Sequence, residues 1–289
     1  MERFMVACGP TRARSNSRRA FTLLELLIVL AVLVLLIAIL VPSLRAARSQ
    51  TKRAVCASNL GQIARGWHLY LDEFNGRFLK GVDVNWNYGG KQGNGSAAFG
   101  SVPKNSQQPW DCADKFDPTK CTPQIRKPLN RFLGLDEVVF DRADVFHCPA
   151  DKGGGDVPTN HYDYKGTSYI TNLMLVGQTQ LSLRLFDPCR KAIKDLNRTL
   201  KDLRRHQLYN ESKLVLIGDG GWVNAWDIGA FRRIDWHDRP RTHNVAFMDG
   251  HVEFLEIRKG LHVTSDYSVV PFKDLVDDFQ ACQKEVEGE

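Results

Sequence analysis

Side chains that could do chemistry gather near the C-terminal end of the chain. Six acidic and histidine residues fall within seventeen positions: Asp235, His237, Asp238, His243, Asp249 and His251. Such residues can bind a metal ion or carry protons in a hydrolytic reaction. The histidine pair at i and i+4 that is typical of metalloproteases is absent from them. We therefore expect polar residues that flank a turn, with His237 or His243 held by hydrogen bonds, rather than a catalytic or metal site.

A second group of acidic residues surrounds a glycine-rich stretch. Residues 151–156 read Asp-Lys-Gly-Gly-Gly-Asp but lack the Gly-Lys-Ser/Thr ending of a phosphate-binding loop. Asp151, Asp156 and Asp163 offer oxygen ligands for calcium, which needs six to eight of them. Three acids supply only part of that shell, so a solvated loop is the simpler interpretation. The sequence also has no Gly-x-Ser-x-Gly nucleophile elbow, and we predict no enzyme activity and no resident cofactor.

The element that must position the rest of the chain is an apolar run at Phe21 to Val41. Only Thr22 and Glu25 interrupt it. As a helix it is roughly 31 Å long, close to the thickness of a bilayer core. Because a soluble helix has no need to be apolar on every face, the run predicts a membrane segment.

Helical periodicity continues beyond this segment. Apolar residues recur at three- and four-residue steps: Leu44, Ala47, Val55, Leu60, Ile63, Trp67, Tyr70, Leu71 and Phe74. Asn75-Gly76 then supplies residues that tolerate a left-handed helix end. The pattern predicts one helix of about fifty residues, from Phe21 to Phe74. Its second half is amphipathic and should pack its apolar stripe on the globular part of the chain.

The start of this helix carries a family resemblance. Ala20-Phe21-Thr22-Leu23-Leu24-Glu25-Leu26-Leu27 resembles the processing site of type IV prepilins and type II secretion pseudopilins. The resemblance implies cleavage between Ala20 and Phe21 by a prepilin peptidase, which also methylates the new N-terminus. Pro42 then falls at mature position twenty-two, where many members have a helix-bending proline. The residue before the cut is usually Gly, and we expect processing to tolerate the small Ala20.

Glu25 has a physical argument of its own. A carboxylate in a membrane helix costs roughly 2.5–3.5 kcal/mol near the bilayer centre, so it normally has a partner or a role. In the resembled family it pairs with the N-terminal amine of a neighbouring subunit during filament assembly. The alternative is a tolerated charge that reaches the nearby interface. The register with Phe21 and Pro42 favours the assembly role.

The resemblance implies a pilin-like structural subunit assembled through its N-terminal helix into a pseudopilus or pilus of a type II secretion-like system. It implies residues 1–20 as leader, 21–41 as membrane segment, 42–75 as the second half of the helix and 76–289 as a periplasmic or extracytoplasmic domain. The chain would cross the cytoplasmic (inner) membrane once and enter a filament. Partners would be other pilin-like subunits, the prepilin peptidase and the assembly platform. The alternative is a membrane-tethered periplasmic enzyme or glycan-binding domain that uses the same anchor.

Charge and cysteine content fit an extracytoplasmic domain. The formal charge is +6, but residues 1–20 hold five Arg against one Glu, so about +2 remains without them. The basic balance therefore does not indicate nucleic-acid binding. Cys8 would be lost with the leader, which leaves six cysteines and fifteen possible pairings in an oxidising compartment. Cys112 and Cys121 flank a short polar loop and are the best single pair.

The sequence pattern of the remaining chain predicts an antiparallel sheet with long loops. One of these loops is expected at Arg77 to Gln108. Strands are expected at Ser168–Met174 and Ser212–Asp219, with a strand end and a turn at Val145–Asp151 and a short helix around Asn130–Leu135. The fold class is thus α+β and pilin-like, with the long helix packed on the sheet.

The last expected element is a hairpin within Asn244 to Ile257. Asp249-Gly250 is a two-residue turn signal that would place Met248 opposite His251 and Phe247 opposite Val252. Val245, Phe247, Val252 and Phe254 would then share the core face.

This region, with Cys56 to Ile63, also resembles large pseudopilin-like proteins that have a C-terminal Asp-Gly motif. The usual motif has nine residues between a His and Asp-Gly. Here five residues follow His243 and eleven follow His237 before Asp249, so the spacing departs from that pattern.

Overall fold

The structure is a computed structural model. Among its described residues, the longest element is the predicted N-terminal helix. Helix α1 spans Leu23–Glu73, 51 residues, and contains Pro42. The structure describes residues 22–79, 84–91, 93, 127–137, 139, 141–154, 157, 159–176, 203–223 and 234–287. The chain divides into two compact units, Met1–Ala47 and Arg48–Glu289, so the boundary falls within α1.

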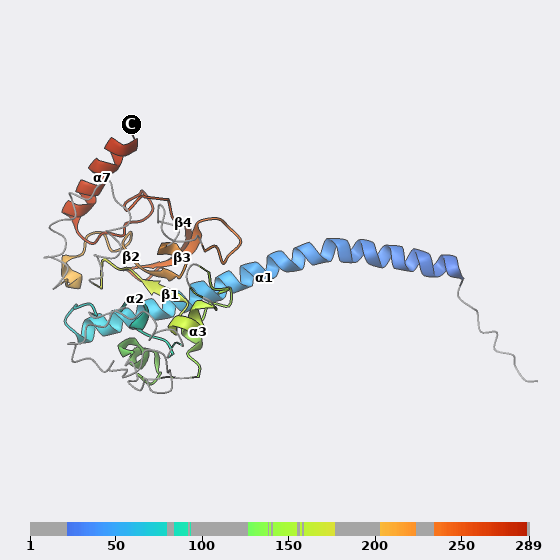
Figure 1. Cartoon of the computed structure of the whole chain (residues 1–289), viewed down its shortest axis with the longest axis horizontal. Helices are drawn as coiled ribbons and strands as arrows, with labels where there is room; N and C mark the ends of the chain where they lie inside the picture. The colour runs from blue at the N-terminus through green and yellow to red at the C-terminus, as the bar shows by residue number, and fades with distance from the viewer. Residues whose placement is uncertain are drawn as a thin grey trace, which may run out of the picture. The chain divides into compact units, whose positions relative to one another are not determined.

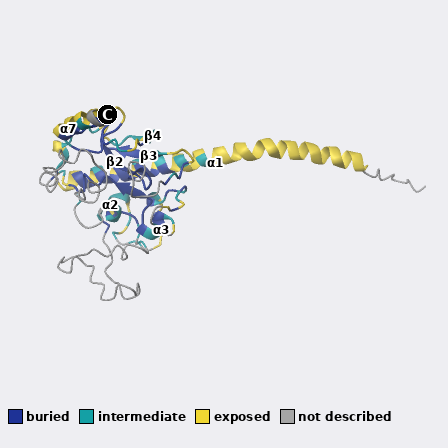
Figure 2. Cartoon of the chain, turned by 45° about the horizontal axis from the view of Figure 1, so that its top comes forward, coloured by how far each residue is buried: buried dark blue, intermediate teal, exposed yellow. Residues whose placement is uncertain are grey.

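The first unit contributes the apolar part of α1. Every residue from Leu23 to Ala47 is exposed (Figure 2). Apolar side chains are among them, such as Leu33 and Leu36, which are 47% and 57% exposed. By length and composition, this is the one helix among the described residues that is apolar enough to cross a membrane. The predicted membrane segment is therefore helical and has no partner within its own unit.

The second unit contributes the amphipathic part of α1. Its buried residues recur at helical spacing: Cys56, Asn59, Leu60, Ile63, Ala64, Gly66, Trp67, Tyr70 and Leu71. The ring of Trp67 lies 5.8 Å from that of Tyr70, 6.1 Å from that of Phe78 and 5.9 Å from that of Tyr88. This stripe packs into the core, as the sequence pattern predicted.

Helix α1 ends where the sequence indicated. Asn75 and Gly76 both adopt positive φ, 53° and 74°, and the Gly76 N–H donates to the carbonyl of Leu71 at 2.6 Å. This left-handed turn satisfies a carbonyl that the helix end leaves without a partner.

Four strands form one antiparallel sheet in the order β1-β2-β3-β4 (Figure 1). They are β1 (Tyr169–Thr171), β2 (Val215–Asp219), β3 (Thr242–Phe247) and β4 (Val252–Glu256). β2 is buried along its whole length, as its apolar run suggests. The α+β class and the antiparallel sheet are therefore confirmed.

The second half of α1 covers one face of this sheet. The Asn59 amide donates to the Tyr169 hydroxyl of β1 at 3.2 Å. At the other edge, the Arg53 guanidinium lies 4.6 Å from the ring centre of Phe254 on β4. Tyr169 pairs with Asp219, and Phe254 pairs with Asn244. Because cross-strand partners point to the same side, all four side chains face α1.

The other helices are short, apart from the last. They are α2 (Val84–Asn87), α3 (His161–Lys165), the 3-10 helices η1 (Pro128–Leu133), η2 (Asp144–Phe146) and η4 (Arg205–Gln207), and α7 (Lys273–Glu287). η1 confirms the short helix expected around Asn130. The strand end expected at Val145 is wrong, because η2 occupies that position. A strand was expected over Ser168–Met174, but it is confined to β1.

The β3–β4 hairpin corrects the predicted register by one residue. Ala246 pairs with Val252 and Val245 with Glu253, and the Phe247 N–H donates to the carbonyl of His251 at 2.9 Å. The loop therefore has three residues, and Gly250 adopts φ 95° at its end. A slip of one position moves side chains to the opposite face. The predicted face of Val245, Phe247, Val252 and Phe254 is thus split between the two sides.

Candidate functional site

The predicted processing and assembly residues lie at the start of α1. Ala20 and Phe21 fall outside the described residues. Glu25 is described and forms a capping box with Thr22. The Thr22 N–H and hydroxyl lie 2.9 Å and 3.0 Å from Glu25 Oε2, and the Glu25 N–H donates to Thr22 Oγ1 at 3.2 Å. The Glu25 carboxylate, to which the resemblance assigns a role in assembly, therefore also caps the start of α1.

Pro42, the other predicted assembly residue, lies inside α1 and is exposed. It is seventeen positions from Glu25 along the helix, so the structure does not bring the two side chains together. Their roles in assembly stay predictions.

The six acidic and histidine residues near the C-terminal end separate into different environments. His237 and His243 are buried and converge on Asp219, the last residue of β2. His243 Nδ1 lies 2.6 Å from Asp219 Oδ1, and His237 Nε2 lies 3.4 Å from Asp219 Oδ2. The Asn244 N–H donates to Asp219 Oδ2 at 3.0 Å. The expectation that a histidine is hydrogen-bonded in place is confirmed, and Asp219 is its partner.

The Asp219 carboxylate is fully buried, so its charge must be balanced locally. Burial alone would raise the pKa of this carboxyl. The nearby His243 imidazole and the hydrogen bonds from His237 and His243 oppose burial and hold the pKa well below its usual range. The cluster is therefore built to keep Asp219 ionised in the interior.

The other members of the six are surface or loop residues. Asp249 and His251 form an exposed pair beside the hairpin turn, with Oδ1 and Nδ1 2.5 Å apart. Asp235 Oδ1 accepts the Arg241 N–H at 2.8 Å. Asp238 Oδ2 accepts the Ser49 hydroxyl at 2.9 Å. These contacts match the interpretation of polar residues around turns.

The acids considered for calcium have donors within the protein. Asp151 accepts the backbone N–H groups of Gly153, His161 and Tyr162 and the hydroxyl of Ser168, at 2.7–3.0 Å. Asp163 pairs with Lys91 at 2.5 Å. Asp156 falls outside the described residues. A calcium loop therefore stays an untested alternative to the solvated loop, and the ion would have to compete with these donors.

A disulfide joins α1 to the loop that follows η2. It links Cys56 and Cys148, which are 92 positions apart in sequence. The favoured pair Cys112 and Cys121 falls outside the described residues. Cys282 is also disulfide-bonded. Spacing alone could not reveal the long-range pair, because only the packing of α1 on the sheet brings Cys56 to Cys148.

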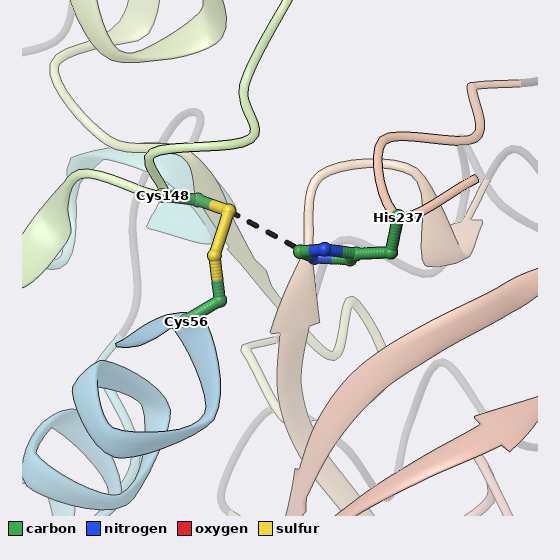
Figure 3. A group of neighbouring side chains, drawn as sticks. All are labelled: Cys56, Cys148 and His237. Carbon is green, nitrogen blue, oxygen red and sulfur yellow. Dashed lines mark hydrogen bonds between the residues drawn. A yellow bond between two sulfur atoms is a disulfide. The ribbon is translucent and has the colours of Figure 1, made fainter. Parts of the chain in front are cut away.

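His237 points toward this disulfide (Figure 3), and it also contacts the Asp219 carboxylate. Its Nε2 lies 3.8 Å from Cys148 Sγ and 3.1 Å from the Asn244 amide nitrogen. Both cysteines are fully buried and His237 is 5% exposed. Among the described residues, one candidate ligand atom from each of Cys56, Cys148 and His237 lies within 4.8 Å of the others. We call Cys56, Cys148, Asp219 and His237 the staple cluster.

Other ionisable groups are also buried among the described residues, and Lys127 is the most deeply buried of the lysines. Lys127 is fully buried, and burial lowers the pKa of its amine to about 7. Its Nζ donates to the Lys165 carbonyl at 3.4 Å. An amine with such a pKa can act as a nucleophile, but this one has no access to solvent.

Sequence reasoning missed Asp219 as a site residue. The sequence pattern predicted Asp219 only as the last residue of the strand Ser212–Asp219. The available signal was a carboxylate that closes an apolar run, Val215-Leu216-Ile217-Gly218, in a strand expected at the centre of a sheet. Such a charge needs a partner when it is buried. Its histidine partners are 18 and 24 positions away in sequence, so spacing could not identify them.

Comparison with known proteins gives one match. Residues 15–41 match the family model of the prokaryotic N-terminal methylation motif. No curated protein and no solved structure matches the chain. The match covers the predicted cleavage position, Glu25 and the apolar run. It indicates processing of the prepilin type at the start of α1, and the apolar part of α1 is consistent with a membrane anchor.

Proposed function

We propose that this chain is a pilin-like structural subunit that is cut between Ala20 and Phe21 and assembles through α1 into a pseudopilus or pilus. The observation that carries the proposal is the methylation motif at residues 15–41. It coincides with the half of α1 that has no partner in its own unit. In this proposal residues 1–20 are the leader, 21–41 cross the inner membrane, 42–75 form the second half of the helix and 76–289 are the extracytoplasmic domain.

The environment of α1 supports assembly rather than anchoring alone. An anchor needs only length and apolarity, which the run from Leu26 to Val41 provides. The carboxylate of Glu25 adds a cost in lipid that an anchor does not require. In a filament, that carboxylate would neutralise the N-terminal amine of a neighbouring subunit. A type II secretion-like assembly platform would supply the partners and the work.

The capping box makes a sharp experiment possible. Glu25→Gln removes the charge but keeps a side chain that can complete the capping box, because Gln also serves at this position. Thr22→Ala is the matched control, because it removes the cap and keeps the charge. Cells that express each full-length variant are tested for cleavage of the leader and for the chain in sheared surface filaments and in the membrane fraction.

If the charge serves assembly, Glu25→Gln is cleaved but leaves the filament fraction, while Thr22→Ala remains in it. If both variants reach filaments as the wild type does, the assembly role of Glu25 is wrong. Changing Ala20 to Leu should block cleavage and leave the longer chain in the membrane. A chain that is never cleaved in wild-type cells would contradict the proposed function itself.

A further inference from the structure

The staple cluster holds two kinds of contact that a plain disulfide does not need. One is the imidazole of His237, whose Nε2 lies 3.8 Å from Cys148 Sγ. The other is the Asp219 carboxylate, whose Oδ2 lies 3.4 Å from the same nitrogen. Two sulfurs and one imidazole nitrogen thus lie within 4.8 Å of one another, and a carboxylate oxygen lies beside that nitrogen. These are the atoms that bind zinc in proteins.

We propose that the staple cluster becomes a zinc site when the Cys56–Cys148 disulfide is reduced. The four ligands are the two thiolates, His237 Nε2 and Asp219. A site with four protein ligands and no open position is structural rather than catalytic. The metal would link α1 to the Cys148 loop in the reduced protein, as the disulfide links them in the oxidised protein.

Two of the separations already fit such a site, and both start from His237 Nε2. At Zn–N distances of about 2.0–2.1 Å and Zn–S distances of about 2.3 Å, tetrahedral ligand atoms stand roughly 3.3–3.8 Å apart. The observed separations from His237 Nε2, 3.8 Å to sulfur and 3.4 Å to oxygen, fall in this range. The two sulfurs, which are joined by the disulfide, must move apart once their bond is broken. The Asn244 amide, 3.1 Å from Nε2, must turn away so that the nitrogen can bind the metal.

The chemistry balances with a dithiol as the reductant. The dithiol transfers two electrons and two protons to the Cys56–Cys148 bond, becomes a cyclic disulfide and leaves two thiols. Zinc then displaces the two thiol protons and binds the thiolates. The proton that His237 Nε2 donates to Asp219 moves to Nδ1, which has no hydrogen-bond partner, so that the lone pair of Nε2 can bind the metal. A disulfide oxidant, which accepts two electrons and becomes a dithiol, restores the sulfur–sulfur bond and releases the ion.

Charge also favours this set of ligands. Two thiolates and one carboxylate carry a total of −3, and zinc brings the buried cluster to −1. His243 keeps its hydrogen bond to Asp219 Oδ1, the oxygen that does not bind the metal, at 2.6 Å from Nδ1. This contact resembles the outer-shell hydrogen bonds that orient metal-binding carboxylates.

The test uses the full-length protein in detergent, reduced by a phosphine in the presence of cobalt(II) as a spectroscopic probe. We expect one cobalt ion per chain, with tetrahedral visible bands and a thiolate charge-transfer band that zinc abolishes. Reduced His237→Gln should bind at least about tenfold more weakly, since even outer-shell changes cost 10–100-fold. Before reduction this variant keeps the disulfide, so its folding is verified by circular dichroism in the oxidised state.

Two matched controls separate this site from other metal ligands. His251→Gln removes an exposed histidine of the same hairpin and should bind cobalt as the wild type does. Cys282→Ser removes a cysteine that reduction also frees. This variant should bind cobalt as the wild type does, because Cys282 is not a ligand in the proposed site. Zinc should also raise the melting temperature of the reduced wild type but not of reduced His237→Gln. The proposal is overturned if the reduced wild type binds no stoichiometric metal, if it unfolds with or without zinc, or if His237→Gln binds equally well.

Discussion

Helix α1 brings together two stretches of similar length and opposite character. From Leu23 to Ala47 every residue is exposed, although almost all are apolar. From Arg48 to Glu73 a stripe of residues is buried against the sheet and the aromatic cluster of Trp67. The same secondary structure therefore serves two environments. The second stretch packs on residues of its own chain, whereas the first stretch has no partner within its own unit.

The difference shows how far a sequence pattern specifies its surroundings. An amphipathic stripe indicates a partner on one side, and in the second stretch that partner is the sheet of the same chain. A helix that is apolar all round indicates an apolar solvent or several neighbouring helices. The first stretch has no such neighbours among the described residues. In the proposed function, its partners are lipid before assembly and the helices of other subunits after it.

The largest effect should come from the centre of the buried stripe. Trp67→Ala should lower the free energy of unfolding by about 3–5 kcal/mol, because it removes a fully buried ring and leaves a cavity. Leu33→Ala, in the exposed stretch, should leave this free energy within about 0.5 kcal/mol of the wild type. Chemical denaturation of both full-length variants in detergent measures the difference. Equal losses for the two variants would break the comparison.

The next effect tests the covalent link between the second stretch and the domain. Replacing both Cys56 and Cys148 by Ala should cost about 2–4 kcal/mol, because the disulfide closes a long loop of the unfolded chain. The melting temperature of the double variant is compared with that of the oxidised wild type. Insertion of the first stretch into membranes should be unchanged, and a loss of insertion would show that the two stretches are coupled.

The buried carboxylate beneath the second stretch should make stability depend on pH. The pKa of Asp219 is lower in the folded protein than in the unfolded chain. Its contribution is therefore present above the unfolded pKa of about 4 and is lost as the pH falls below it. Asp219→Asn should lower stability at pH 7 by about 1–3 kcal/mol, because the buried partners lose an ionised acceptor. It should also flatten the acid part of the stability curve, and an unchanged slope would contradict this account.

The smallest effect is expected at the exposed end of the second stretch. Glu73 pairs with Arg131, and both side chains are well exposed. Glu73→Gln should change the free energy of unfolding by less than about 1 kcal/mol, since exposed ion pairs contribute little. High salt should reduce even this difference. A larger loss would mean that burial alone does not separate the important contacts of α1 from the others.

Much of this architecture could be predicted from the residues. The length of α1, its division into two stretches and its end at Asn75-Gly76 all follow from apolar periodicity and helix-end chemistry. The hairpin at Asp249-Gly250 was also found. Its register was not, because Gly250 can end either a two-residue or a three-residue loop. The actual choice depends on which side chains the α1-facing side of the sheet can bury.

The candidate site was harder to predict because it depends on long-range packing. Asp219, His237 and Cys148 come from a strand and two loops, and Cys56 comes from α1. No local spacing connects them. The structure shows that the imidazole of His237 contacts both the disulfide and the carboxylate, and only the packing of α1 on the sheet creates that arrangement. By contrast, the motif at residues 15–41 is local, so the sequence alone could identify it.

The most direct test of the central claim asks what the exposed stretch of α1 touches in cells. A photoreactive amino acid is placed at Leu33 of the full-length chain, which is then irradiated in cells and analysed by immunoblotting. We predict a ladder of covalent products of this chain with other pilin-like subunits. The ladder should persist with Thr22→Ala and disappear with Glu25→Gln. A result with only lipid adducts and single chains, identical in all three backgrounds, would show that this stretch is merely an anchor.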